Sequence, residues 1–186
     1  QIRLVGSEMC IRDRNITIPE KVKVLLTGNT INIEGPLGKQ TMNVDLEMFD
    51  LNINEGKNIS IKPKNVNDNS KRLWGMNRSL INNAIIGAST GYEKILELTG
   101  VGFRAALKGE VLNMQLGFSH DINFDIPKGV KIVVEKQTTL KISGSNKQQV
   151  GMVASQIKSI RPPEPYKGKG IKEKGQYILR KEGKKK

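Results

Sequence analysis

One stretch near the C-terminal end of the chain concentrates the side chains with the clearest chemical role. Residues 158–175 read KSIRPPEPYKGKGIKEKG. Three prolines hold the backbone extended and reduce the entropy lost when the segment docks on a partner. Alternating Lys and Gly at 167–170 let ammonium groups and bare backbone approach phosphates, and Tyr166 can stack on a base or a sugar. The pattern therefore predicts contact with a polyanion, and with RNA in particular.

The candidate RNA-binding residues follow from this segment. A flexible solubilising tail does not need Pro, Tyr and Gly at such regular places. The terminal run Lys184–Lys186 is different, because a charge run alone is usually a solvated surface. The candidates within the segment are Lys158, Arg161, Tyr166, Lys167, Gly168, Lys169, Gly170, Lys172 and Lys174.

A second motif, residues 100–105 (GVGFRA), matches the loose glycine fingerprint of dinucleotide-binding loops. Such a loop needs a helix directly after it, so that free backbone amides meet the pyrophosphate. Lys108-Gly109 would break any helix within a turn. We therefore interpret the motif as a glycine-rich strand junction, which is either a purely structural turn or an RNA contact in which Arg104 binds a phosphate.

Catalytic and metal-binding patterns are weak throughout the chain. Ser119-His120-Asp121 holds the three side-chain types of a hydrolase triad, but consecutive residues cannot converge on one reacting atom. Cys10 is the only cysteine, which excludes an intrachain disulfide and a cysteine-based zinc site and favours a reducing compartment. We expect no catalytic residue, metal ion, cofactor or small-molecule substrate, and therefore reject an enzyme acting on nucleic acid as the rival interpretation.

The charge balance indicates the same class of partner. The chain carries 31 Lys and Arg against 18 Asp and Glu, a formal net charge of +13. Residues 158–186 hold 11 of the basic residues against 3 acidic ones, a net of +8, which marks this end as the electrostatic footprint. No run approaches the roughly 18 apolar residues that a membrane span requires, so we expect no membrane partner.

An internal repeat organises the elements around these residues. Residues 18–24 (IPEKVKV) recur 108 positions later as residues 126–132 (IPKGVKI). Each copy opens an alternating strand, and a second alternating strand that ends in glycine follows it, at 31–35 and 140–144. Gly28-Asn29 favours a tight hairpin turn in the first copy, because both residue types tolerate positive φ angles. A tandem duplication is the simplest explanation.

Each half then continues into one amphipathic helix. Ser70 is placed to cap the first helix, and Asn146 with Gln149 forms a capping-box pattern for the second, which Arg161-Pro162 ends. Short antiparallel strands fill residues 92–125. The predicted fold class is α+β, with two tandem duplicated domains, each an antiparallel sheet packed with one main helix, and a basic C-terminal extension.

The domain boundaries are set by these elements. We expect a first domain over residues 15–90, a second over 91–161 and an extended basic RNA-binding tail over 162–186. Without RNA this tail has too little apolar surface to offset the entropy of ordering. Residues 1–14 break the pattern, lack the apolar core of a secretory signal and resemble a translated library adapter, so we expect them to be non-native.

The segment at 162–171 (PPEPYKGKGI) resembles the signature of the ribosomal protein six family of the large subunit, bacterial type. Further landmarks of that family occur in order: Ile18-Pro19, then GPLG at 35–38, LTGVGFR at 98–104 and the closing basic tail. The resemblance extends from about residue 15 to residue 186. It departs from the family at the start, where a short segment rich in Arg, Gly and Lys would be expected.

The resemblance implies a function and a set of partners. It implies a structural constituent of the large ribosomal subunit that binds 23S-type rRNA near the elongation-factor-binding region and supports translation. The partners would be large-subunit rRNA, neighbouring large-subunit ribosomal proteins and, nearby, translation elongation factors. The location would be cytoplasmic, on the ribosome, with an organellar matrix as the alternative. A free-standing RNA-binding regulator is the alternative function. The contact residues carried over from the family are Arg161, Tyr166, Lys167, Lys169 and Lys172.

Overall fold

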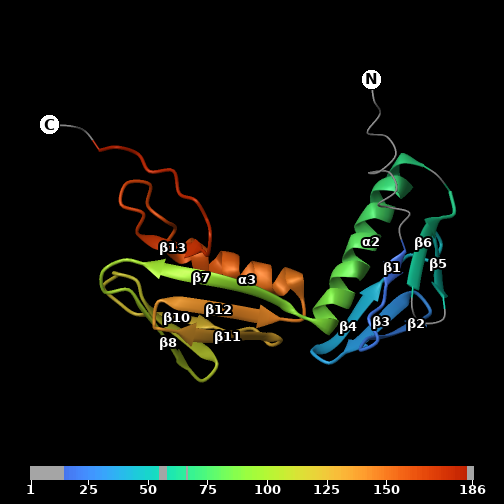
Figure 1. Cartoon of the computed structure of the whole chain (residues 1–186), viewed down its shortest axis with the longest axis horizontal. Coiled ribbons are helices and arrows are strands. Elements are labelled where there is room, and N and C mark those ends of the chain that lie inside the picture. Colours follow the sequence, from blue (N-terminus) through green and yellow to red (C-terminus); the bar gives the residue numbers. More distant parts are fainter. Residues whose placement is uncertain (1–14, 55–57, 66, 184–186) are drawn as a thin grey trace. The chain divides into compact units, whose positions relative to one another are not determined.

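The computed structural model describes residues 15–54, 58–65 and 67–183. They divide into two compact units, unit 1 within residues 1–91 and unit 2 within residues 92–186 (Figure 1). The described part of each unit holds antiparallel strands and one long helix, so the predicted α+β class is confirmed. The segment 1–14 that was predicted to be non-native lies outside the described residues, as does Lys184–Lys186.

Unit 1 distributes its described strands over two antiparallel sheets, of strand order β2-β3-β4 and β1-β6-β5. Helix α2 packs against β3, β4 and β6. Alternation explains the strands, because Ile31 and Ile33 of β3 face the core while the residues between them do not. The elements are β1 (Ile16–Thr17), β2 (Lys23–Thr27), β3 (Thr30–Gly35), β4 (Gly38–Asn43), β5 (Phe49–Asn54), β6 (Asn58–Pro63) and α2 (Asp68–Ser89).

Unit 2 has a four-stranded sheet of order β11-β12-β7-β13 and a three-stranded sheet of order β10-β9-β8 within its described residues. Helix α3 packs on β7, β12 and β13. Its buried side chains, Val150, Val153, Ala154 and Ile157, recur at helical spacing. The elements are β7 (Tyr92–Thr99), β8 (Arg104–Lys108), β9 (Val111–Gln115), β10 (Ile122–Asp125), β11 (Val130–Glu135), β12 (Thr139–Gly144), α3 (Lys147–Ile160) and β13 (Gly170–Glu173).

The local signals for turns and caps are largely confirmed. Gly28 adopts a φ of +55° in the β2–β3 hairpin, whereas Asn29 does not have a positive φ. Asn146 caps α3 as predicted, its Oδ1 accepting from Gln148 N at 2.9 Å. The start of α2 was predicted slightly late: Asn67 is the N-cap, and Ser70 lies one turn inside, where its Oγ accepts the Asn67 N–H at 2.8 Å.

The duplication is visible in matching turns and close approaches. Val22 N donates to Pro19 O at 3.0 Å, and in the second copy Val130 N donates to Pro127 O at 3.3 Å. The glycine that closes the second strand also lies against the helix in both copies. A Cβ added to Gly35 would come within 2.8 Å of Ala88 Cβ on α2, and one added to Gly144 within 2.9 Å of Val150 Cγ2 on α3.

Each unit contains two sheets that correspond to those of the other unit, but the strands follow one another in a different order along the chain. Sheet β2-β3-β4 corresponds to β11-β12-β7, and sheet β1-β6-β5 corresponds to β10-β9-β8. The registers agree: Ile31 pairs with Met42 where Leu140 pairs with Leu96. Strands β4, β5 and β6 therefore follow β3 in unit 1, whereas their counterparts β7, β8 and β9 precede β12 in unit 2.

One further property concerns membranes. Among the described residues, neither helix offers a stretch long and apolar enough to cross a bilayer.

Candidate nucleic-acid interface

The chain that leaves α3 turns back and joins the larger sheet of unit 2. Strand β13 pairs antiparallel with β7, with Gly170 opposite Thr99 and Ile171 opposite Leu98. Ile171 is fully buried in the core of unit 2. Its backbone N–H also donates to Arg161 O at 2.9 Å, which ties the strand to the end of the helix. We name the intervening residues 161–171 the basic loop.

Backbone hydrogen bonds close the basic loop on itself. Glu164 N donates to Lys169 O at 2.8 Å, and Gly168 N donates to Glu164 O at 3.0 Å. Gly168 adopts a φ of +69°, which favours glycine there. Residues 165–167 form the turn at the tip, where Tyr166 is 54% exposed. Tyr166 and Lys167 are thus held outward by a bonded turn.

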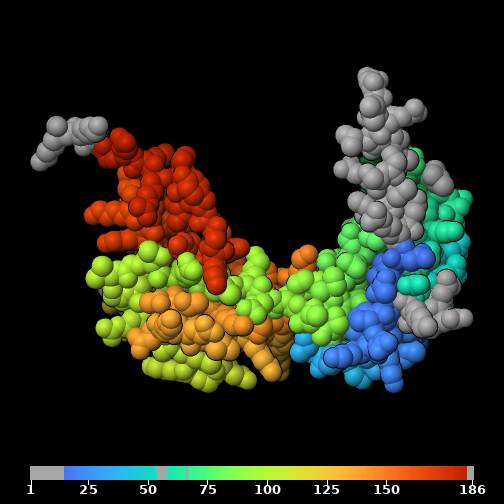
Figure 2. Space-filling view, in the orientation of Figure 1, coloured from blue at the N-terminus to red at the C-terminus, as the bar shows by residue number. Residues whose placement is uncertain are grey.

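The residues after β13 form hydrogen bonds with β7 and with the basic loop. Lys174 N donates to Ile95 O at 2.9 Å, and Lys181 N donates to Pro165 O at 3.0 Å. In the space-filling view the red C-terminal residues form one continuous mass over unit 2 (Figure 2). The expectation that residues from 162 onward stay disordered without RNA is therefore wrong for β13, because Ile171 supplies the apolar anchor that the composition concealed.

The structure separates the predicted basic residues by their ionic partners. Lys158 lies 3.5 Å from Glu173, which Lys94 approaches at the same distance. Lys172 lies 3.3 Å from Glu97 on the neighbouring strand. Within the described residues no carboxylate pairs with the remaining predicted cations, which are Arg104, Arg161, Lys167, Lys169 and Lys174. These five are exposed and electrostatically available to an anion.

The glycine-rich strand junction lies beside the basic loop. Residues 100–103 form a turn between β7 and β8, in which Gly102 has a φ of +79° and Phe103 is buried. No helix follows the motif, which removes the geometry that a dinucleotide would need. Arg104 begins β8 and is exposed. The sequence placed the two motifs some 60 residues apart, and the Thr99–Gly170 pairing brings them together.

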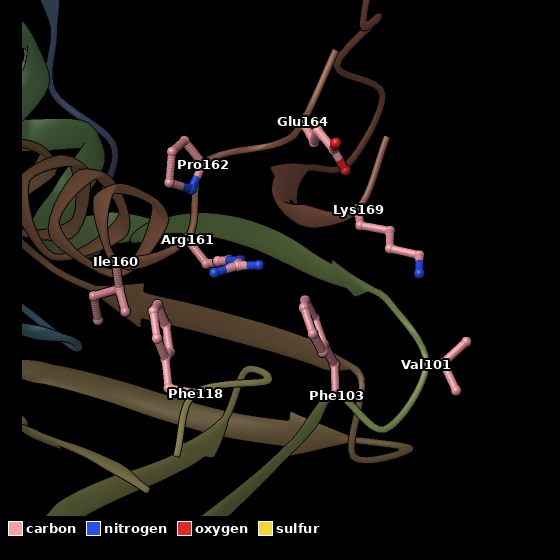
Figure 3. Close-up of a pocket in the computed structure, with 8 residues that line it drawn as sticks. All are labelled: Val101, Phe103, Phe118, Ile160, Arg161, Pro162, Glu164 and Lys169. Carbon is pink, nitrogen blue, oxygen red and sulfur yellow. The ribbon is translucent and has the colours of Figure 1, made fainter. Parts of the chain in front are cut away.

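A cavity of about 500 Å³ lies where the two motifs meet (Figure 3). The side chains of Phe103 and Phe118 lie on one side of the cavity, and those of Arg161 and Pro162 lie on the other. The Arg161 guanidinium carbon lies 5.0 Å from the centre of the Phe118 ring, a cation–π distance. The complete lining is Val101, Phe103, Phe118, Ile160, Arg161, Pro162, Glu164 and Lys169.

Three residues near the basic loop, Phe118, Tyr177 and Arg180, were not singled out from the sequence. Tyr177 is 85% exposed among basic residues, and Arg180 lies against Gly168, where an added Cβ would be 3.6 Å from its Nη2. An aromatic residue within a basic segment was the available signal for Tyr177. Phe118 and Arg180 had none, because their positions depend on how the chain folds back.

Two of the triad-like residues, His120 and Asp121, make local contacts. Asp121 Oδ2 accepts from Gln115 Nε2 at 3.5 Å, and the His120 ring centre lies 6.3 Å from that of Phe118. Across residues 15–54, 58–65 and 67–183, no cluster of three or more His, Cys, Asp and Glu side chains could hold a metal ion.

Comparison with known proteins identifies the lineage of this site. The family model described as Ribosomal protein L6 matches residues 99–174, the part that contains both the glycine-rich turn and the basic loop. The large ribosomal subunit protein uL6 of Methylocella silvestris is 44% identical over 176 residues, covering 95% of this chain and 98% of its own. The uL6 proteins of Phenylobacterium zucineum and Caulobacter vibrioides show the same identity and coverage. The chain belongs to the ribosomal protein L6 family.

Membership in the L6 family confirms the resemblance seen in the sequence. It makes the chain a structural constituent of the ribosome rather than an enzyme.

Proposed function

We propose that this chain binds the rRNA of the large ribosomal subunit through unit 2, chiefly through the basic loop and the residues that return to it. The observation that carries the proposal is the anchoring of this loop by β13. Lys167 and Lys169 are exposed there, and no carboxylate in the described part of the chain pairs with them. A fixed loop loses little entropy on binding, and its ammonium groups displace counterions from RNA.

The charge of the two units supports this assignment. Residues 92–186 carry 19 Lys and Arg against 9 Asp and Glu, a net of +10. Residues 15–91 carry 9 against 7, a net of +2. Because nonspecific attraction to a polyanion grows with the number of available cations, unit 2 is the stronger RNA-binding half.

The finer location is part of the same proposal. We place the bound rRNA near the elongation-factor-binding region of the large subunit, with neighbouring ribosomal proteins and elongation factors close by. The support is membership in the L6 family, because the residues of this chain that the family model matches, 99–174, include the whole basic loop. Chemical cross-linking from Lys167 in assembled subunits, followed by sequencing of the linked RNA, identifies the neighbours. Cross-links confined to rRNA remote from the factor-binding region would overturn this location.

The decisive experiment is a salt titration of binding to purified large-subunit rRNA. The variant Lys167→Gln/Lys169→Gln/Lys174→Gln removes three available cations of unit 2. The matched control Lys21→Gln/Lys23→Gln/Lys62→Gln removes three exposed lysines of unit 1. The slope of log K against log salt concentration is negative, and each lost phosphate contact reduces its magnitude by about 0.7–0.9.

We expect the unit 2 variant to reduce that slope by about 2 and the control to leave it nearly unchanged. Equal effects of the two variants would show that attraction is diffuse and that the basic loop is not the interface. Sedimentation of the chain with subunits in high salt distinguishes a stable constituent from a free-standing regulator, which would stay in the supernatant.

A further inference from the structure

The cavity between the basic loop and the glycine-rich turn is built differently from a phosphate-binding surface. Its lining combines aromatic rings with charged side chains: Phe103 is buried, Phe118 is 40% exposed, and Arg161, Glu164 and Lys169 lie around them. Ile160 and Pro162 add aliphatic surface. Phosphate contacts need no aromatic ring, and the ring of Phe118 lies outside the core cluster to which Phe103 and Ile160 contribute.

We propose that this cavity receives one unpaired nucleobase of the bound RNA. This inference rests on the proposed rRNA-binding function. Bases released from a helix stack on aromatic rings and on arginine guanidinium planes. Phe118 and Arg161 supply both, with the guanidinium already 5.0 Å from the ring centre. A base would displace or join this pair without loss of an ion pair, because Arg161 has no carboxylate partner in the described residues.

The charged side chains at the rim suit a nucleotide rather than an apolar protein side chain. Lys169 extends along one side of the cavity toward the exposed Val101, and Arg161 lies on the opposite side (Figure 3). A base placed between them leaves its flanking phosphates within reach of both cations. The lining therefore combines stacking surface with two positive charges, as sites for single-stranded RNA do.

Glu164 gives the cavity a basis for choosing among bases. Its carboxylate points into the same space (Figure 3), and a carboxylate can only accept hydrogen bonds. Cytosine presents an exocyclic amino group as a donor, whereas uracil presents a carbonyl oxygen at that position. The cavity should therefore favour cytosine over uracil, two bases of equal size.

The test uses the full chain and a trinucleotide RNA with 2-aminopurine at its centre. Stacking in the cavity quenches the probe's fluorescence, and unlabelled CCC and UUU trinucleotides compete for it. The variant Phe118→Leu removes the ring but keeps an apolar side chain, while Phe124→Leu makes the same change at a partly buried position outside the cavity. We expect Phe118→Leu to weaken binding about tenfold with little change in salt dependence, and Phe124→Leu to leave it unchanged.

Further outcomes separate this inference from the proposed function. CCC should compete better than UUU, and Glu164→Ala should make the two equal. If the probe is not quenched, or if Phe118→Leu and Phe124→Leu behave alike, while large-subunit rRNA still binds, the cavity holds no base and the proposed function stands. Loss of both binding activities would overturn both. A partner peptide that displaces the probe more effectively than any trinucleotide would instead assign the cavity to a protein neighbour.

Discussion

Gly170 shows how one residue fixes the geometry of the interface. It adopts a φ of +140°, and a Cβ added there would lie 2.6 Å from both Pro162 O and Pro163 Cα. The backbone of the loop's beginning thus occupies the volume that any other residue would need. The glycine is required where the two ends of the basic loop cross, whereas the sequence had suggested only an approach to phosphate.

Substituting this glycine should destabilise unit 2. We expect Gly170→Ala to cost about 2–4 kcal/mol, combining backbone strain with a steric clash. Gly151→Ala is the matched control, because Gly151 lies within α3 with nothing within 4 Å of the added Cβ. That change should stabilise the helix by up to about 1 kcal/mol. Urea unfolding followed by circular dichroism measures both, and a neutral Gly170→Ala would contradict the crossing geometry.

A carboxylate in unit 1 provides a test of local electrostatics. Lys39 Nζ lies 2.7 Å from Glu34 Oε1, and this hydrogen bond and charge lower the pKa of Glu34 below its ordinary 4.5, with a smaller contribution from Lys23. Because the folded-state pKa is lowered, the pair stabilises the fold above pH 4.5, and this contribution is lost as the pH falls through the folded value.

An NMR titration of the Glu34 carboxyl carbon should therefore give a midpoint below 4.5. Lys39→Ala should raise the midpoint, and Lys23→Ala should raise it less. If Lys23→Ala raised the midpoint more than Lys39→Ala, Lys39 would not be the main cause of the lowered pKa of Glu34. Lys62→Ala, at an exposed lysine outside this pair, serves as the unchanged control.

For single residues, the sequence predicted which side chains are exposed cations but not which carboxylates they pair with. The spacing of Lys167 and Lys169 predicted exposed cations, and both are exposed. Nothing in the spacing could reveal that Lys172 meets Glu97, since the two are joined only by the pairing of β13 with β7. Such contacts depend on register between distant strands.

The element that most affects the interface is β13. Four residues with one fully buried side chain attach the basic loop to the sheet. A strand this short, reading GIKE, gives no alternation that could separate it from a coil. The long helices were predictable because their apolar period repeats over several turns, and the hairpins because glycine marks their turns.

Weakening this strand should weaken RNA binding without changing any charge. Ile171→Ala removes buried atoms from the core of unit 2 and should cost about 2–5 kcal/mol, against about 1 kcal/mol for Ile171→Val. Where Ile171→Ala remains folded by circular dichroism, we expect lower affinity for large-subunit rRNA at fixed salt concentration. Undiminished affinity in the folded variant would mean that the loop needs no anchor.

For the whole molecule, the uneven charge predicts uneven contact. Hydrogen exchange of the full chain, measured with and without large-subunit rRNA, should show new protection concentrated in residues 158–183. Peptides from residues 15–90 should change less, because this part carries a net charge of only +2. Protection spread evenly over both ranges would contradict the assignment of the interface to unit 2.

The duplication was detected from the sequence, but only for part of each unit. Residues 18–24 and 126–132 align at one offset because each segment forms the turn before, and the start of, an equivalent strand, β2 or β11. Strands β4 to β6 find their counterparts in β7 to β9, which lie at a different separation. A comparison at a single offset cannot reveal both sets.

This strand order decides which paired strands a short turn can join. Gly35 and Gly38 are paired neighbours joined by the short turn Pro36-Leu37, whereas the corresponding pair, Gly144 and Tyr92, lies 52 positions apart in the sequence. Phe49 and Phe103 stand 54 positions apart, half of the 108 that separate Ile16 from Phe124. Each unit therefore contains the same two triplets of strands, but β4–β6 follow β1–β3 in unit 1, whereas their counterparts β7–β9 precede β10–β12 in unit 2.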